Sequence, residues 1–290
     1  MSVFMPSFGF GLISAAVLAI AAVGFTMQFA VTNVLNLAYG SIMINSAFVT
    51  YWVNRTGVSV WLALFVGVAC GAVVSWCLNR FIYTPFQRRN PAAITVVIVS
   101  LGVDLIGTFG LQAIISGSDV SYIMSQGREL HILGMDLSVV ELIIFAICAV
   151  VLVSVRLLLK FSRLGKAMRA TAANRSLARN SGVKTDLIVS LTWLISGALC
   201  GLAGTVFAID AGTFGATSAE LYVVLILAAV FLGGPGEPYG AMLGALTIGL
   251  ATEISAAYLT SDYKEVVAFL VLLGMLAFRP FGLFGSEKTS

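Results

Sequence analysis

Residues 156–184 read RLLLKFSRLGKAMRATAANRSLARNSGVK and separate two long apolar stretches of the chain. This basic segment carries eight of the sixteen Lys and Arg residues and no Asp or Glu. A cationic loop between two membrane spans stays on the cytoplasmic side, so the segment predicts the orientation of the spans around it. It is also longer than a simple turn requires, which suggests a docking surface.

The composition of the whole chain indicates a membrane protein. Hydrophobic residues make up 59% of the 290 residues, charged residues make up 10%, and the mean hydropathy is +1.02. A soluble domain carries about 25% charged residues, so this much apolar surface requires a lipid environment. Nucleic-acid binding is not expected, because no soluble domain accompanies the basic segment.

The apolar runs predict an all-α polytopic membrane protein with about eight or nine transmembrane helices and additional short or re-entrant helices. The candidate spans are residues 8–30, 37–53, 58–81, 92–115, 138–159, 187–209, 220–234, 238–257 and 265–279. The sequence Gly233-Gly234-Pro235-Gly236 predicts a tight reversal or a re-entrant element between the seventh and eighth runs.

Charged loops alternate along the chain. Three groups of basic residues mark segments that we expect in the cytoplasm: Arg80 with Arg88 and Arg89, residues 156–184, and Arg279 with Lys288. The loops at 116–137 and 210–220 are mixed or acidic and fit the opposite side. This alternation predicts a cytoplasmic C-terminus and an external N-terminus.

The basic segment itself predicts two short helices. The Ala-rich stretch from Gly165 to Ala173 favours one helix, Asn174 interrupts it, and residues 176–181 form a second helix that Gly182 ends as a C-terminal cap. Two interpretations fit these residues equally well. The segment is either an amphipathic element held by anionic lipid headgroups or a lever that fits a cleft on a cytoplasmic motor.

Asp104 and Glu253 are carboxylates that lie within apolar runs. A charged side chain in a membrane span costs roughly 2.5–3.5 kcal/mol on insertion scales, so it faces a cavity or a partner. Asp104, in the middle of its run, either lines a translocation route or bonds to a neighbouring helix. Glu253 lies late in its run, where we expect a structural role. Polar residues around the first two runs favour interhelical hydrogen bonds or a pathway lining: Gln28, Asn33, Asn36 and Asn45.

Catalytic and metal-binding patterns are missing from the sequence. The four cysteines, Cys70, Cys77, Cys148 and Cys200, all fall in apolar runs and are expected to pack as small residues. The single histidine, His131, lies in a polar loop without spaced ligand partners. Walker A, Gly-x-Ser-x-Gly and His-Glu-x-x-His patterns do not occur. We therefore expect no catalytic residue, no metal site and no cofactor bound by this chain.

Small residues recur at the spacing that lets membrane helices pack closely. Three Gly-x3-Gly pairs lie within the apolar runs: Gly67 with Gly71, Gly197 with Gly201, and Gly240 with Gly244. A faint internal repeat is also visible, because residues 12–16 resemble residues 194–198. Such a repeat is either an inverted transporter repeat or a coincidence of low complexity.

Five stretches resemble, in order, the Liv-type permeases of branched-chain amino acid ABC importers. They are Asn36-Leu37-Ala38-Tyr39-Gly40, residues 165–170, residues 196–204, Phe231-Leu232-Gly233-Gly234 with Tyr239-Gly240-Ala241, and residues 278–285. The resemblance runs from residue 8 to residue 285. It implies one transmembrane permease domain over residues 1–290 in the bacterial inner membrane, not an enzyme. The implied solutes are branched-chain or other hydrophobic amino acids; urea, short amides and small carboxylates are alternatives.

The resemblance also implies partners and sites. The implied partners are a second homologous permease, two cytoplasmic ATPase subunits that bind ATP and Mg, an external substrate-binding protein and membrane lipid. The implied ATPase-coupling segment, about residues 161–186, has these candidate residues: Gly165, Lys166, Met168, Arg169, Arg175, Ser176, Ala178 and Gly182. The candidate residues of the translocation pathway are Asn36, Tyr39, Gly40, Ser100, Asp104, Gly233 and Gly234.

The sequence departs from the family pattern at two places. Family members carry Glu-Ala-Ala-x3-Gly in the coupling segment, whereas this chain has Ser176-Leu177-Ala178-x3-Gly182. A contact made by that glutamate is therefore not expected in this chain, whereas docking by helix shape does not require it. Tyr39 and Ser41 replace a family His and Asp, which bears on substrate preference or gating. A different function class, a proton-coupled secondary transporter with Asp104 as carrier, would work without an ATPase.

Overall fold

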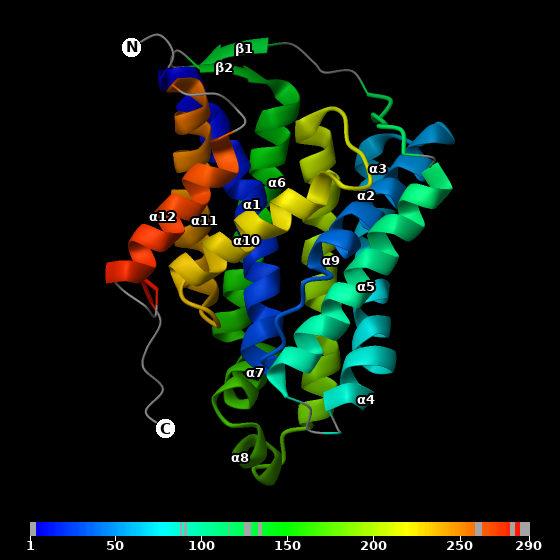
Figure 1. Ribbon diagram of the computed structural model, residues 1–290, viewed down its shortest axis with the longest axis vertical. Coiled ribbons are helices and arrows are strands. Elements are labelled where there is room, and N and C mark those ends of the chain that lie inside the picture. The colour runs from blue at the N-terminus through cyan, green and yellow to red at the C-terminus, as the bar shows by residue number, and fades with distance from the viewer. Residues whose placement is uncertain are drawn as a thin grey trace. The chain divides into compact units, whose positions relative to one another are not determined.

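The computed structural model describes residues 4–87, 89, 92–115, 117–124, 129–132, 135–258, 263–278 and 282–284. Helices make up most of this part of the chain (Figure 1). Their bounds are α1 Phe4–Thr32, α2 Tyr39–Arg55, α3 Val60–Leu78, the π-helix η1 Asn79–Tyr83, α4 Thr84–Gln87, α5 Ala93–Ile115, α6 Val139–Phe161, α7 Arg163–Ala173, α8 Arg175–Asn180, α9 Thr185–Ala211, α10 Ser218–Gly233, α11 Pro238–Tyr258 and α12 Lys264–Phe278. The antiparallel strands β1 (Glu129–Ile132) and β2 (Met135–Ser138) form a hairpin in which Glu129 pairs with Ser138.

The predicted all-α polytopic membrane fold is confirmed, apart from this hairpin. Each of the nine predicted apolar runs coincides with a helix in the described residues. Within the part of the chain that the structure describes, six helical stretches are long and apolar enough to cross a membrane: Met5–Thr32, Val60–Gln87, Ile94–Ile115, Val139–Phe161, Thr185–Ala211 and Pro238–Tyr258. Helices α10 and α12 are apolar but shorter, and α2 has 17 residues. Arg88, Arg279 and Lys288, which we used for orientation, lie outside the described residues.

The chain forms two compact units, and each takes helices from both halves of the sequence. The first unit comprises residues 1–26, 124–152 and 221–290, and the second unit comprises residues 27–123 and 153–220. In the second unit, α9 from the C-terminal half packs on α3 and α2. In the first unit, α1 from the N-terminal half packs on α11, where a Cβ atom at Gly249 would meet the backbone of Ala15 at 2.5 Å.

Glycines bring α3 and α9 into backbone contact in the second unit. A Cβ atom on Gly71 would lie 2.5 Å from the Gly197 carbonyl oxygen, and one on Gly201 would lie 2.7 Å from the Gly67 carbonyl oxygen. Real Cβ atoms do not approach other atoms that closely. The two predicted small-residue pairs therefore face each other across one helix interface, as lipid-embedded helices favour.

The first unit contains the predicted reversal and explains two of the quoted motifs. Gly234 and Gly236, with φ of 108° and 94°, form the turn between α10 and α11. The Leu283 and Phe284 amides donate to the carbonyls of Leu232 and Gly233 at 2.9 and 3.1 Å. The C-terminal Gly-Leu-Phe stretch thus satisfies carbonyls at the end of α10 that have no partner within the helix.

Candidate translocation and coupling sites

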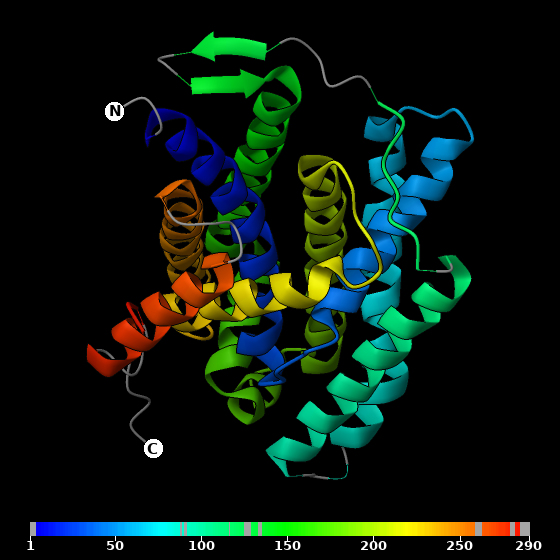
Figure 2. The ribbon, with the colours of Figure 1, turned by 45° about the horizontal axis from the view of Figure 1, so that its top comes forward.

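Helical structure stops between α1 and α2, within the second unit (Figure 2). Residues 33–38 are not helical, and Asn33 adopts a φ of 54°, a left-handed conformation that asparagine tolerates better than most residues. The hydroxyl of Tyr39, the first residue of α2, donates to the Ser196 carbonyl at 3.3 Å. Because Ser196 lies near the middle of the 27-residue helix α9, the α2 side of the break lies near mid-depth of a membrane-length helix.

Two residues of α5, one helical turn apart, stabilise the break. The Leu37 amide donates to Ser100 Oγ at 3.2 Å, and the Ser41 amide donates to Asp104 Oδ1 at 3.2 Å. Irregular backbone is tolerated at membrane depth only where its polar groups find partners inside the protein. The first amides of α2 lack acceptors within the helix, and the helix dipole is positive there. Asp104 therefore caps α2 from a neighbouring helix, which is one of the two roles that the sequence left open.

A cluster of buried polar and aromatic side chains lies beside the break, and we call it the polar centre. Its members are Gln28, Asn36, Tyr39, Tyr83, Trp193 and Ser196, each at most 1% exposed. The Tyr83 hydroxyl donates to Asn36 Oδ1 at 2.7 Å, and Ser196 Oγ donates to Gln28 Oε1 at 3.2 Å. The Tyr83 and Trp193 ring centroids lie 4.8 Å apart. The polar centre thus joins the end of α1, the break, η1 and α9.

The structure brings together five of the seven predicted pathway residues. Asn36, Tyr39 and Gly40 lie at the break or begin α2, and Ser100 and Asp104 contact the same region from α5. The other two, at the end of α10, belong to the first unit. Sequence reasoning missed Tyr83 and Trp193, because a single Tyr or Trp in or beside an apolar run is indistinguishable from an ordinary membrane-helix residue.

The predicted pair of short helices in the basic segment is confirmed as α7 and α8. Ser162 caps α7 by accepting the Gly165 amide at 2.9 Å, and Asn174 caps α8 by accepting the Leu177 amide at 2.9 Å. Gly182, with a φ of 85°, ends α8. The Gly182 amide donates a hydrogen bond to the Arg179 carbonyl, and the Val183 amide donates one to the Ala178 carbonyl, as in a Schellman cap.

Several residues of this basic segment pack it against neighbouring parts of the second unit. Met168 and Ala178 are buried. A Cβ atom on Gly165 would collide with the backbone of Leu158 and Leu159 at the end of α6. The Arg169 guanidinium donates to the Leu159 carbonyl, where a cation also favours the negative end of the helix dipole. These contacts fix the direction in which α7 leaves α6.

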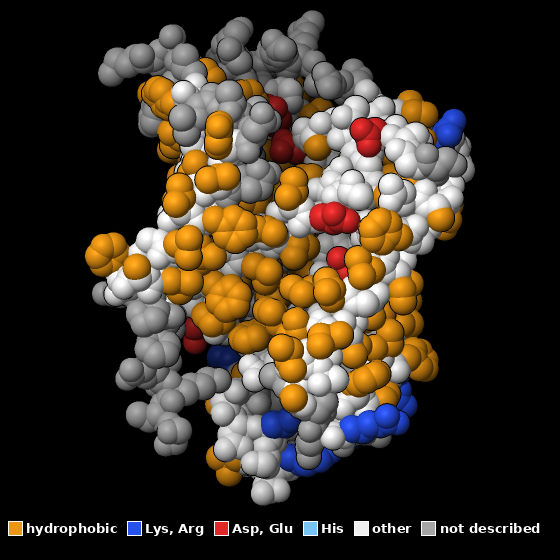
Figure 3. Space-filling model, in the orientation of Figure 1, with side chains coloured by type: hydrophobic (Ala, Val, Ile, Leu, Met, Phe, Trp, Pro, Cys, Tyr) orange, Lys and Arg blue, Asp and Glu red, His pale blue; other side chains and the backbone are white. Residues whose placement is uncertain are grey.

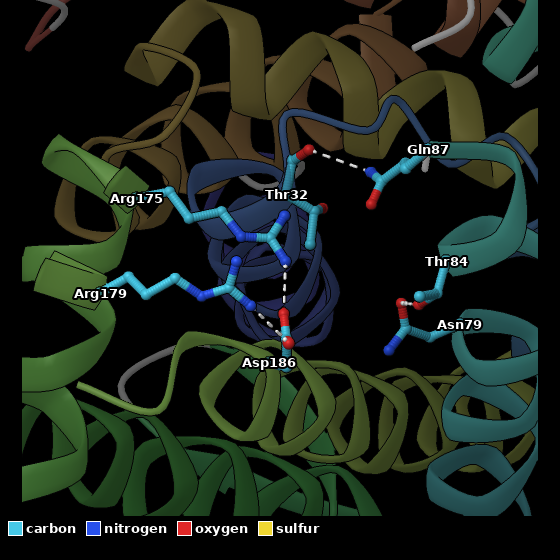
Figure 4. A network of polar contacts seen from close by, with 7 residues as sticks. All are labelled: Thr32, Asn79, Thr84, Gln87, Arg175, Arg179 and Asp186. Atoms are coloured by element: carbon cyan, nitrogen blue, oxygen red, sulfur yellow. Dashed lines mark hydrogen bonds and ion pairs between the residues drawn. The ribbon is translucent and has the colours of Figure 1, made fainter. Parts of the chain in front are cut away.

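Asp186, in the first turn of α9, binds α8 through two arginines. Its carboxylate oxygens lie 3.0 Å from Arg175 Nη2 and 3.0 Å from Arg179 Nη2, and Figure 4 shows both guanidinium groups directed at it. Sequence reasoning did not select Asp186, although an acid directly after eight basic residues is a usable signal. Lys166 and Ser176 are exposed, and Leu177 is 64% exposed, so α7 and α8 present a basic outer surface with one large apolar side chain.

The charges of the second unit are unevenly distributed. Figure 3 shows Lys and Arg side chains gathered over the end formed by α4, α7 and α8. The opposite end holds the loops of residues 117–124 and 212–217, which are joined by the bridge between Val120 and Phe214, together with the end of α2, where Asn54 accepts the Ile123 amide. Among the described residues, no three His, Cys, Asp or Glu side chains are placed to hold a metal ion.

Comparisons with known proteins agree with this architecture. A family model described as "Branched-chain amino acid transport system / permease component" matches residues 7–276. The LivH permease protein of the high-affinity branched-chain amino acid transport system of Escherichia coli K12 is 26% identical, covering 93% of this chain and 92% of LivH. The BraD permease protein of Pseudomonas aeruginosa is also 26% identical, covering 96% of this chain and 94% of BraD.

A solved structure shares the fold. PsaBC from Streptococcus pneumoniae in complex with Fab superposes with a TM-score of 0.51 at 12% identity, covering 92% of this chain and 90% of the matched chain. Because the family model covers most of the sequence, the chain belongs to the family of permease components of branched-chain amino acid transport systems.

Proposed function

We propose that this chain is a permease subunit of an ABC importer that carries branched-chain or other hydrophobic amino acids across the bacterial inner membrane. The observation that carries the proposal is the connection of α7 and α8 to the polar centre through α9. Asp186, which binds α8, precedes Trp193 of the polar centre by seven residues, about two turns or 10 Å along one helix. A displacement of α8 is therefore transmitted to the polar centre by a rigid element.

The proposed partners supply what this chain lacks. Two cytoplasmic ATPase subunits bind ATP and Mg and contact α7 and α8, whose exposed Leu177 and basic residues form the docking surface. A second homologous permease completes the translocation pathway between two permeases, and an external substrate-binding protein delivers the solute. Lipid surrounds the exposed apolar faces. We propose no nucleic-acid partner and no cofactor bound by this chain.

The distribution of charge supports the proposed orientation. The end formed by α4, α7 and α8 carries most of the basic residues of the second unit, so the positive-inside rule assigns this end to the cytoplasm. Gln87 Nε2 donates to the Thr32 carbonyl at 3.3 Å, which places the last turn of α1 at this same end (Figure 4). This assignment supports the proposed external N-terminus. The proposed cytoplasmic C-terminus rests on the basic residues Arg279 and Lys288, and we propose residues 1–290 as one permease domain.

Two rival functions are a proton-coupled transporter that uses Asp104 and a permease of the same class for other solutes. A proton carrier must exchange protons with water during transport, whereas Asp104 is engaged in capping α2. Urea, short amides and small carboxylates are alternative solutes for a permease of the same class. Uptake assays with each solute distinguish these alternatives from a hydrophobic amino acid.

The proposal is tested by affinity purification of the chain from its own host in a mild detergent, with mass spectrometry of the recovered proteins. We expect ATPase subunits and a second permease. Leu177→Ser should reduce recovery of the ATPase, whereas Val58→Ser, an equivalent change in the loop between α2 and α3, should not. Recovery of the wild-type chain alone, with transport in liposomes that lack ATP, would overturn the proposal.

A further inference from the structure

The polar centre contains three buried nitrogen donors without an acceptor among the described residues. They are Gln28 Nε2, Asn36 Nδ2 and Trp193 Nε1, and their side chains are at most 1% exposed. Buried N–H groups in native proteins bond to protein, water or ligand, because leaving one unpaired costs free energy. Three such groups in one cluster mark a place for an acceptor that the described residues do not provide.

Two further residues of the polar centre connect the elements that carry the three donors. Tyr83 bonds to Asn36 Oδ1 and stacks near the Trp193 ring. Ser196, one turn after Trp193 on α9, bonds to Gln28 Oε1. Both amides therefore use their oxygens within the polar centre and leave their nitrogens unpaired.

The number and type of these groups favour a carboxylate over a single water molecule. A water molecule accepts two hydrogen bonds and must donate two, whereas a carboxylate only accepts and offers about four lone-pair directions on two oxygens. None of the six residues of the polar centre is acidic, and the neighbouring Asp104 carboxylate already accepts the Ser41 amide. Asn36 also lies in the non-helical residues 33–38, which are able to move without breaking helical hydrogen bonds.

We propose that Gln28, Asn36 and Trp193 bind the carboxylate of the amino-acid solute as it passes the break between α1 and α2. This inference rests on the proposed function and adds the chemical group of the solute that the permease recognises. It assigns recognition of the solute's common carboxylate to the polar centre, independent of the solute's side chain.

The direct test uses the complete complex from its host in lipid nanodiscs, labelled with 5-fluorotryptophan. The Trp193 signal is assigned in the fluorine NMR spectrum from a Trp193→Phe variant. Leucine should shift this signal, and leucinol, which has the same side chain but no carboxylate, should leave it unchanged. If the same complex transports leucine but leucine leaves the Trp193 signal unmoved, the donors hold water and the inference fails while the proposed function stands. If the wild-type complex transports neither leucine nor any other hydrophobic amino acid, the proposed function itself fails.

Two substitutions test the amide donors separately. Asn36→Asp and Gln28→Glu keep the bonded oxygens and replace only the unpaired nitrogens by oxygen. Each should raise the KM for leucine uptake about tenfold or more, the size expected for a hydrogen bond to a charged group. Gln112→Glu, the same chemical change on α5 outside the polar centre, should leave the KM unchanged. An unchanged KM in both test variants would overturn the inference, and the wild-type spectrum decides the question if a variant does not assemble.

Discussion

Gly71→Ala tests the close packing of α3 against α9. The added methyl group would lie 2.5 Å from the Gly197 carbonyl oxygen and 2.9 Å from Gly201 Cα, whereas ordinary contacts lie at 3.4–4 Å. The helices must therefore separate by roughly 1 Å, and overpacking of this kind costs about 1–3 kcal/mol. The higher helix propensity of alanine offsets up to about 1 kcal/mol of that cost. We expect a net loss of about 1–2 kcal/mol.

The matched control for this change is Gly102→Ala on α5, where a Cβ atom would meet nothing within 4 Å. It should be neutral or stabilising by up to about 1 kcal/mol. Circular dichroism of the purified proteins in one detergent measures both variants against the wild type. Gly71→Ala should lower the unfolding midpoint by about 2–8 °C, and Gly102→Ala should not lower it. If both variants unfold at the wild-type temperature, the glycines do not form the helix interface.

Three further predictions concern single contacts. Asp104→Asn keeps an acceptor for the Ser41 amide, so ATP-dependent uptake should persist near the wild-type rate; its complete loss would support a proton carrier. Asp186→Asn releases two exposed ion pairs worth about 0.2–1 kcal/mol each, so the chain should remain folded while recovery of the ATPase falls. An unfolded variant, or undiminished recovery, would contradict this role. Gly282→Ala places a side chain at a φ of 77°, with its Cβ 2.6 Å from the Phe231 carbonyl oxygen, and should destabilise the protein by about 1–3 kcal/mol. An unfolding midpoint equal to that of the wild type would show that the C-terminal stretch does not pack on α10.

Local chemistry explains which features were predictable from the sequence. Apolar runs identified the spanning helices, because a span must be about 20 apolar residues long whatever its neighbours are. Asn174 and Gly182 identified the ends of α8, because capping depends on neighbouring residues only. The glycine pairs on α3 and α9 were visible as spacing, although the sequence did not show that they face each other.

The polar centre required tertiary information. The runs 8–30 and 37–53 predicted two spans, but the depth of the break between them depends on partners far along the chain, Ser100 and Ser196. The coupling segment shows the same limit. Arg169 was selected as an ATPase-coupling residue, and the structure gives it a bond to the Leu159 carbonyl within the chain. Helical periodicity places a residue on a face but does not identify what that face contacts.

Leucine uptake by the complete complex in proteoliposomes tests the central claim most directly. With the substrate-binding protein outside and ATP inside, we expect uptake that requires ATP and continues when an uncoupler abolishes the proton gradient. Uptake by this chain alone, without ATP and abolished by the uncoupler, would contradict the importer account.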